Sequence, residues 1–195
     1  MSKKTKKEMP VPTLAASMLK RLLAFLLDWY LGGVLSMMPV AFLWNMRTGE
    51  TKVNLNIVAL GRQGIYAALA AILLLIVYFY VIPWLVWPGQ TIGKRILSIA
   101  VVDKNGSSVP AGRLAVRQIG ILLFLETMSL MTGNPILSLF TLLFNERVST
   151  VLSYASMVLL AISVLMCSFS RQHQALHDWL TGTEVVVVKR ADAVY

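Results

Sequence analysis

The sequence has few charged residues, a single cysteine and only two histidines. Charged side chains make up 14% of its 195 residues and hydrophobic ones 57%, whereas soluble domains carry roughly 25% charged residues. So little polar surface excludes a soluble enzyme and a disordered chain. The lone Cys167 excludes a disulfide within the chain. The composition therefore indicates an integral membrane protein with one domain and small parts outside the bilayer.

Acidic residues are also scarce, because 9 Asp and Glu oppose 18 Lys and Arg. In a membrane protein, an excess of basic residues keeps loops on the cytoplasmic side. The sequence has no basic, aromatic-rich soluble module, so no nucleic-acid partner is expected. Nothing resembles a nucleophile with its base, a phosphate loop or a dinucleotide turn, and we predict neither enzymatic activity nor a cofactor. His173 and His177 have a spacing that suits a metal, but no third ligand accompanies them and no metal site is predicted.

Four apolar stretches predict an all-α integral membrane protein with four transmembrane helices, at residues 22–44, 65–87, 114–131 and 148–169. A helix needs about 20 residues to cross the hydrocarbon core, and each stretch approaches or exceeds that length. Residues 136–144 are apolar but too few to cross. They form a re-entrant or interfacial segment, or the far end of a kinked third helix.

The distribution of basic residues predicts the topology. If the N-terminus, the 88–118 loop and the C-terminus lie on one side, that side holds 14 of the 18 Lys and Arg, and the other side holds 4. The bias predicts a multi-pass protein of the cell (cytoplasmic) membrane with both termini cytoplasmic. We divide the chain into a basic cytoplasmic N-terminal segment (1–19), a transmembrane domain (20–190) and a short tail (191–195).

A small cytoplasmic β element is predicted beside the helices. Residues 97–103 alternate as a strand, and the turn at 103–106 predicts a return strand at 107–110. A run of valines predicts a further strand at 184–189. Together these strands would join the loop and the tail in one sheet.

Two acidic residues fall within predicted spans. Asp28 lies about 9 Å inside the inner boundary, on the same helical face as Arg21. An intramembrane acid should face protein or water rather than lipid, so Asp28 is either an ion-pair partner that holds helices together or an ion and proton site. Glu126 lies near the middle of the third span, without a partner in its own helix. Two carboxylates at different depths can form a proton relay or a hydrated cation path.

Small residues share one face of the fourth span and predict close packing against another helix: Ser149, Ser153, Ser156, Ser163 and Cys167. After this span, residues 175–180 carry an apolar side and predict a short interfacial helix.

Three segments together resemble the RDD family of small membrane proteins. The first is residues 20–28, with Arg21 and Asp28. The second begins with Gly-Gln-Thr-Ile-Gly-Lys-Arg at residue 89 and runs to residue 117. The third is Gln-Ala-Leu-His-Asp at residues 174–178, followed by Gly-Thr and the valine strand. Arg21, Asp28 and Asp178 match the Arg and two Asp that name the family, and we expect them to gather near the inner membrane boundary.

The resemblance implies two functions of different classes. Bacterial members are described as transporters, at least one is credited with cation/proton antiport, and a eukaryotic relative serves in a membrane protein quality-control complex. The first hypothesis is therefore a monovalent cation/proton exchanger that uses Asp28 and Glu126, with Na⁺ or K⁺ and protons as its ions. The alternative is a non-catalytic scaffold or assembly partner in a larger membrane complex. Four spans are few for a lone transporter, so a homo-oligomer or a partner membrane protein is expected within the bilayer.

Overall fold

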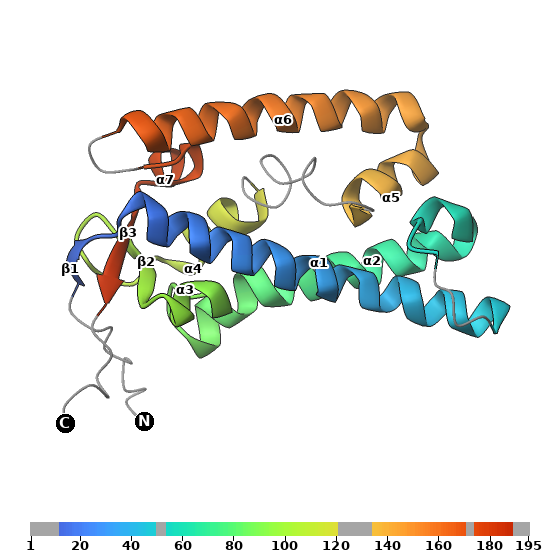
Figure 1. Ribbon diagram of the computed structural model, residues 1–195, viewed down its shortest axis with the longest axis horizontal. Helices are drawn as coiled ribbons and strands as arrows, with labels where there is room; N and C mark the ends of the chain where they lie inside the picture. Colours follow the sequence, from blue (N-terminus) through green and yellow to red (C-terminus); the bar gives the residue numbers. More distant parts are fainter. Residues whose placement is uncertain (1–11, 50–53, 121–133, 171–173, 189–195) are drawn as a thin grey trace.

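The computed structural model describes residues 12–49, 54–120, 134–170 and 174–188. Long helices run side by side, and a small sheet lies at one end of them (Figure 1). The long helices are α1 (Met18–Thr48), α2 (Arg62–Ile76), its π-helical continuation η2 (Val77–Val86), and α6 (Glu146–Phe169). The short helices are η1 (Ile57–Leu60), α3 (Ile92–Ile96), α4 (Ala111–Ala115), α5 (Pro135–Leu143) and α7 (Leu176–Thr181). The strands are β1 (Pro12–Ala15), β2 (Ile99–Asp103) and β3 (Thr183–Val188).

Three helices of the described residues are long and apolar enough to cross a membrane: Met18–Thr48, Arg62–Val86 and Glu146–Phe169. They coincide with the predicted first, second and fourth spans, so the chain is a mostly helical multi-pass membrane protein. The predicted third span is described only to residue 120, and its remainder, with Glu126, lies outside the described residues. A total of four spans and cytoplasmic termini stay predictions.

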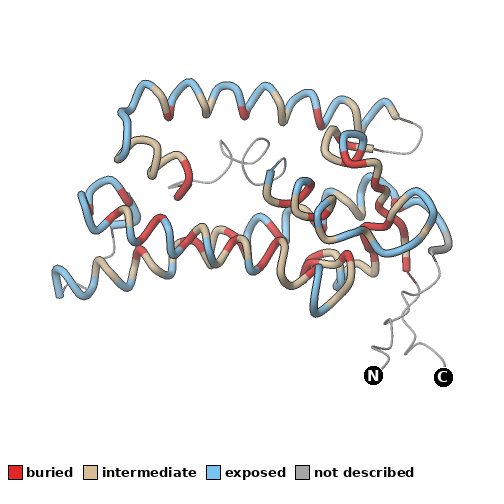
Figure 2. Tube along the Cα trace, turned by 180° about the vertical axis from the view of Figure 1, so that it is seen from behind, coloured by how far each residue is buried: buried red, intermediate tan, exposed pale blue. Residues whose placement is uncertain are grey.

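Small residues bring α1 and α2 into close contact. The buried residues of α1 recur at every fourth position, namely Ala24, Asp28, Gly32, Ser36 and Val40. Those of α2 are mostly glycine and alanine: Gly64, Ala67, Ala68, Ala71 and Leu75. Without large side chains between them, the two backbones can approach closely, as is common in membrane helix pairs. The remaining faces of these helices are largely exposed (Figure 2) and carry apolar side chains that suit lipid.

The break before residue 136 starts a separate helix. The Asn134 side chain accepts from the backbone N–H groups of Ile136 and Leu137, at 2.8 and 3.2 Å, and so caps α5. This nine-residue helix packs against α2 and α6. The buried residues of α6 are Ser149, Ser156 and Ser163, so the small-residue face predicted for this helix is the one that meets the protein.

The sheet differs from its prediction in one strand. Its order is β1-β3-β2, with both pairs antiparallel. The strands predicted at 97–103 and 184–189 correspond to β2 and β3, but the strand predicted at 107–110 is wrong. The N–H of Val101 in β2 donates to the Gly89 carbonyl oxygen at 2.9 Å. Residue 89 therefore occupies the edge of β2 at which the return strand was expected. The third strand is β1, which belongs to the N-terminal segment predicted to lie outside the transmembrane domain.

Two glycines allow the chain to turn back from η2 towards α1. Gly89 has φ +71°, and a Cβ there would lie 2.2 Å from the Val101 carbonyl oxygen. A Cβ on Gly93 would lie 2.6 Å from the Ala24 carbonyl oxygen and 2.8 Å from Asp28 Oδ1. Both contacts are too short for any side chain, so α3 can press against α1 only because residue 93 is glycine.

We expect Gly93→Ala to destabilise the protein by about 1–3 kcal/mol, the usual result of overpacking a tight contact. The measurement is the thermal unfolding midpoint of purified protein in detergent. Gly33→Ala is the control, because a Cβ on Gly33 meets nothing within 4 Å, and its midpoint should not fall. Equal midpoints for the two variants would contradict the close packing of α3 on α1.

Candidate functional site

Asp178 lies in α7 with a fully buried side chain and joins three other parts of the chain. Arg21 of α1 forms an ion pair with its Oδ2. Arg117, in the helical residues that follow α4, donates from Nη2 to its Oδ1 at 2.5 Å. Arg117 Nε also donates to Thr183 Oγ1 of β3, at 3.1 Å. The carboxylate of Asp178 thus connects the first span, the start of the predicted third span and the sheet.

The two arginines keep Asp178 ionised. Burial by itself would raise the pKa of this carboxyl, but Arg117, His177 and Arg21 lie close enough to hold the pKa below its ordinary value. The backbone N–H of Ala175 donates to Oδ2 at 3.2 Å and adds to the same effect. The carboxylate therefore has several donors, which a buried charge requires.

Asp28 lies in the first span, is 3% exposed and has a different set of partners. The Tyr78 hydroxyl donates to its Oδ1 at 2.6 Å, and the Gly93 N–H donates to the same oxygen at 2.9 Å. The Thr91 hydroxyl donates to Oδ2 at 2.5 Å. These bonds attach α1 to η2 and to α3, and the α-to-π change in the second span is where Tyr78 faces Asp28. A carboxylate has about four acceptor sites, so three donors leave room for one more.

Lys94 is a third cation beside these two carboxylates. Burial lowers its pKa from 10.5 to about 8, with Arg117 and Arg21 acting in the same direction, while Asp28 and Asp178 partly oppose the shift. Within the described residues, its ammonium makes no hydrogen bond or ion pair. Lys94 is therefore a partly buried amine that can gain or lose its proton near pH 8.

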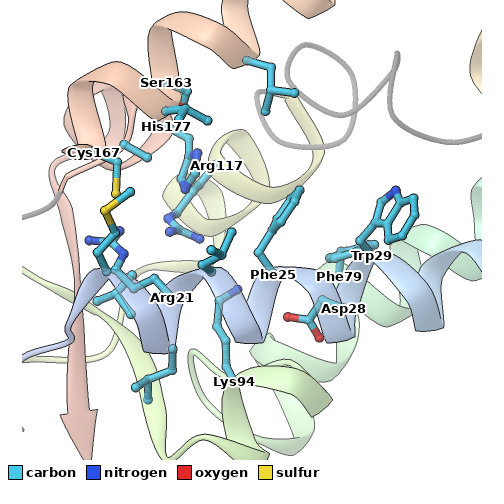
Figure 3. A pocket seen from close by; sticks show the side chains of 17 residues that line it. Arg21, Phe25, Asp28, Trp29, Phe79, Lys94, Arg117, Ser163, Cys167 and His177 are labelled. Atoms are coloured by element: carbon cyan, nitrogen blue, oxygen red, sulfur yellow. The ribbon is translucent and has the colours of Figure 1, made fainter.

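A cavity of about 200 Å³ lies beside these groups. Its charged lining comes from Arg21, Asp28, Lys94, Arg117 and His177. Figure 3 shows Arg21 and Asp28 on α1, with Lys94 and Arg117 reaching towards them, and Ser163 and Cys167 on the facing part of α6. The cavity therefore lies between the first and last described spans, at the end of the bundle that carries the sheet.

The structure brings together some of the residues expected at the site and not others. Arg21 and Asp178 form an ion pair, whereas Asp28 lines the same cavity but is bound by Tyr78, Thr91 and Gly93. Glu126 lies outside the described residues. His177 is adjacent to Asp178, with Nε2 and Oδ1 3.6 Å apart. No group of three or more metal-ligating side chains occurs in the described part of the chain.

Sequence reasoning missed four participants: Tyr78, Thr91, Lys94 and Arg117. Three of them fall in the segment from 89 to 117 that resembles the family, which was the available signal. From the sequence, Arg117 and Lys94 are basic residues of an inner loop within that segment, and neither is predicted to lie beside an acidic residue. Tyr78 is a residue of an apolar span, and its sequence neighbours give no sign that it faces Asp28.

We expect Asp178→Asn to destabilise the protein by roughly 3–5 kcal/mol, because it leaves two buried guanidinium groups without their counter-charge. Asp103→Asn is the matched control. Its carboxylate pairs with Arg113 at 2.9 Å, where the Arg113 side chain is 41% exposed, and such a pair contributes at most about 1 kcal/mol. Thermal unfolding at pH 7 compares the variants.

The same measurement has a defined pH dependence. The pKa of Asp178 is lowered on folding, so its stabilising contribution is present above the ordinary Asp pKa and is lost only as pH falls through the folded value. The difference between wild type and Asp178→Asn should therefore persist down to about pH 5. A difference that disappears between pH 7 and 5 would contradict the ion-pair cluster.

The comparisons with known proteins give one match. The model of the RDD family matches residues 15–182, a range that contains Arg21, Asp28, Lys94, Arg117 and Asp178. No curated protein and no solved structure matches the chain. Because the match covers most of the sequence, the chain belongs to the RDD family.

Proposed function

We propose that this membrane protein exchanges a monovalent cation, Na⁺ or K⁺, for a proton at Asp28 and Lys94. The observation that carries the proposal is that a carboxylate with a remaining acceptor site and an amine that can titrate line one cavity. Intramembrane acids of this kind mark ion and proton pathways in many transporters.

The net charge of the site would allow it to hold either the proton on Lys94 or the cation beside Asp28, but not both. When Lys94 is protonated, Arg21, Lys94 and Arg117 oppose the carboxylates Asp28 and Asp178, so the site has one excess positive charge. A cation that entered this state would meet repulsion from three neighbouring cations. When Lys94 loses its proton, a monovalent cation beside Asp28 restores the same net charge. The exchange would then move one proton for one cation.

Hydrogen bonding also favours Asp28 as the ion site. Tyr78 and Thr91 donate to the carboxylate, so their hydroxyl oxygens retain lone pairs that can face a cation. Carboxylate and hydroxyl oxygens are hard ligands, which small hard cations prefer. Asp178 lacks this freedom, since Arg21 and Arg117 both bind it.

We expect Asp28→Asn to abolish exchange while the protein remains folded. The Asn Oδ1 can still accept from Tyr78 and Gly93, and its Nδ2 can donate to Thr91 Oγ1, so the contacts survive and only the charge is lost. The assay is Na⁺- or K⁺-driven proton movement in proteoliposomes, normalised to folded protein. Asp103→Asn, the same change outside the cavity, should exchange at the wild-type rate.

The outcomes separate the two functional hypotheses. Normal exchange by folded Asp28→Asn would exclude Asp28 as the ion site. If wild-type protein exchanges neither Na⁺ nor K⁺, while Asp28→Asn lowers only abundance or partner recovery, the assembly function is supported instead.

We expect exchange by the wild-type protein to be fastest near the Lys94 pKa of about 8 and slower on either side of it, because each cycle both releases and regains the Lys94 proton. Burial favours the neutral amine, so Lys94 holds its proton below this pH and releases it above. The groups around it are Asp28, Asp178, Arg21, Arg117 and His177. Lys94→Gln cannot carry a proton and should lose proton counterflow at every pH. Exposed Lys104→Gln, with the same change in net charge, should keep the wild-type profile.

A further inference from the structure

The cavity between α1 and α6 has apolar walls, apart from its charged groups. Its 200 Å³ equals the volume of roughly six or seven water molecules. The walls contain Leu22, Phe25, Trp29, Phe79, Leu160 and Val164. Such walls offer water few partners, although three cationic side chains line the same space.

Two of these cations keep donors unused. Arg117 is 1% exposed, and its Nε and Nη2 are bound by Asp178 and Thr183, but its buried Nη1 has no hydrogen-bond partner in the described part of the chain. The Lys94 ammonium likewise makes no bond there. Figure 3 shows the Arg117 guanidinium and the Lys94 amine turned towards the same space beside Phe25.

A partly buried cation without a counter-charge, such as Lys94, is costly, and so is a buried donor without an acceptor, such as Arg117 Nη1. With Arg21, Lys94 and Arg117 against Asp28 and Asp178, this site lacks one negative charge. An anionic group would supply both the missing charge and the missing acceptors. The apolar walls between two membrane helices would in turn suit a hydrocarbon chain attached to that group.

We propose that this cavity binds an anionic amphiphile, whose carboxylate or phosphate accepts from Arg117 Nη1 and Lys94 Nζ while its acyl chain lies between α1 and α6. The headgroup site shares Lys94 with the proposed cation exchange, but binding of the amphiphile does not require transport. Two sources share this chemistry, a free fatty acid and an anionic phospholipid.

Cys167 gives a direct measurement, because it is the only cysteine of the sequence and lines the cavity. The protein is placed in phosphatidylcholine vesicles and alkylated with N-ethylmaleimide, alone or with oleate, phosphatidylglycerol, uncharged monoolein or inorganic phosphate. We expect oleate, phosphatidylglycerol or both to slow alkylation, by about tenfold at ten times the dissociation constant. Which of the two acts identifies the source of the headgroup.

A second cysteine position controls for changes in the bilayer itself. Ser168→Cys in a Cys167→Ser background places the thiol one residue away on an exposed face of α6, and its alkylation rate should not respond to the anionic lipids. Equal slowing at this position would overturn the proposal. So would equal slowing by monoolein, slowing by phosphate alone, or no slowing by either anionic lipid.

Lys94→Gln tests the charge. Loss of one charge-assisted hydrogen bond should weaken protection of Cys167 by roughly tenfold or more, whereas Lys104→Gln should leave protection unchanged. Both variants are first compared with wild type by thermal unfolding. Full protection in folded Lys94→Gln would contradict the assigned headgroup site. No ion gradient is present, so the result does not depend on whether the protein exchanges cations.

Discussion

Two arginines from distant parts of the sequence, Arg21 and Arg117, share the buried carboxylate of Asp178. Arg21 belongs to the first span, Arg117 leads into the part of the chain where the third is predicted, and Asp178 follows the last described span. A buried charge is tolerated only when it is paired and hydrogen-bonded, so these segments must meet at one point. Because Thr183 also accepts from Arg117, the same contact places β3, and through β3 both β1 and β2. The sheet end of the molecule therefore depends on this ion-pair cluster.

Asp28 makes a second connection that depends on backbone as much as on charge. Its donors come from η2 and from the turn into α3, and one of them is the backbone N–H of Gly93. That bond needs α3 to lie so close to α1 that no side chain fits at residue 93. Asp28 and the two arginines that bind Asp178, Arg21 and Arg117, line one cavity (Figure 3). As a result, the charged side chains are held at the wall of the cavity, and the space between the helices stays open.

The sequence predicted the long helices well, because their apolar length and bordering polar residues are local properties. It also identified β2 and β3, whose valine-rich patterns are strong. It did not identify β1, since four residues beginning with proline carry no strand signal until β3 provides a partner. The hydrogen bond between Tyr78 and Asp28 also could not be predicted from the sequence. The spacing of Arg21 and Asp28 on one helical face suggested that they form a pair. Instead, Arg21 pairs with Asp178 and Asp28 accepts from Tyr78, and both partners are distant in the sequence.

The two proposals meet at Lys94. An anion bound beside its ammonium would favour the protonated amine, and by linkage the anion would bind more tightly to that state. In the proposed exchange, cation entry at Asp28 would require the opposite state, with Lys94 neutral. Binding of an anionic amphiphile would therefore weaken binding of the cation, although the two would not be in contact. The amphiphile would move the optimum of exchange to higher pH. If that shift occurred without protection of Cys167, the anion would be acting through membrane surface charge rather than through the cavity. Lys94, which both buried carboxylates influence, would in this way connect the lipid around the protein to the proposed ion exchange.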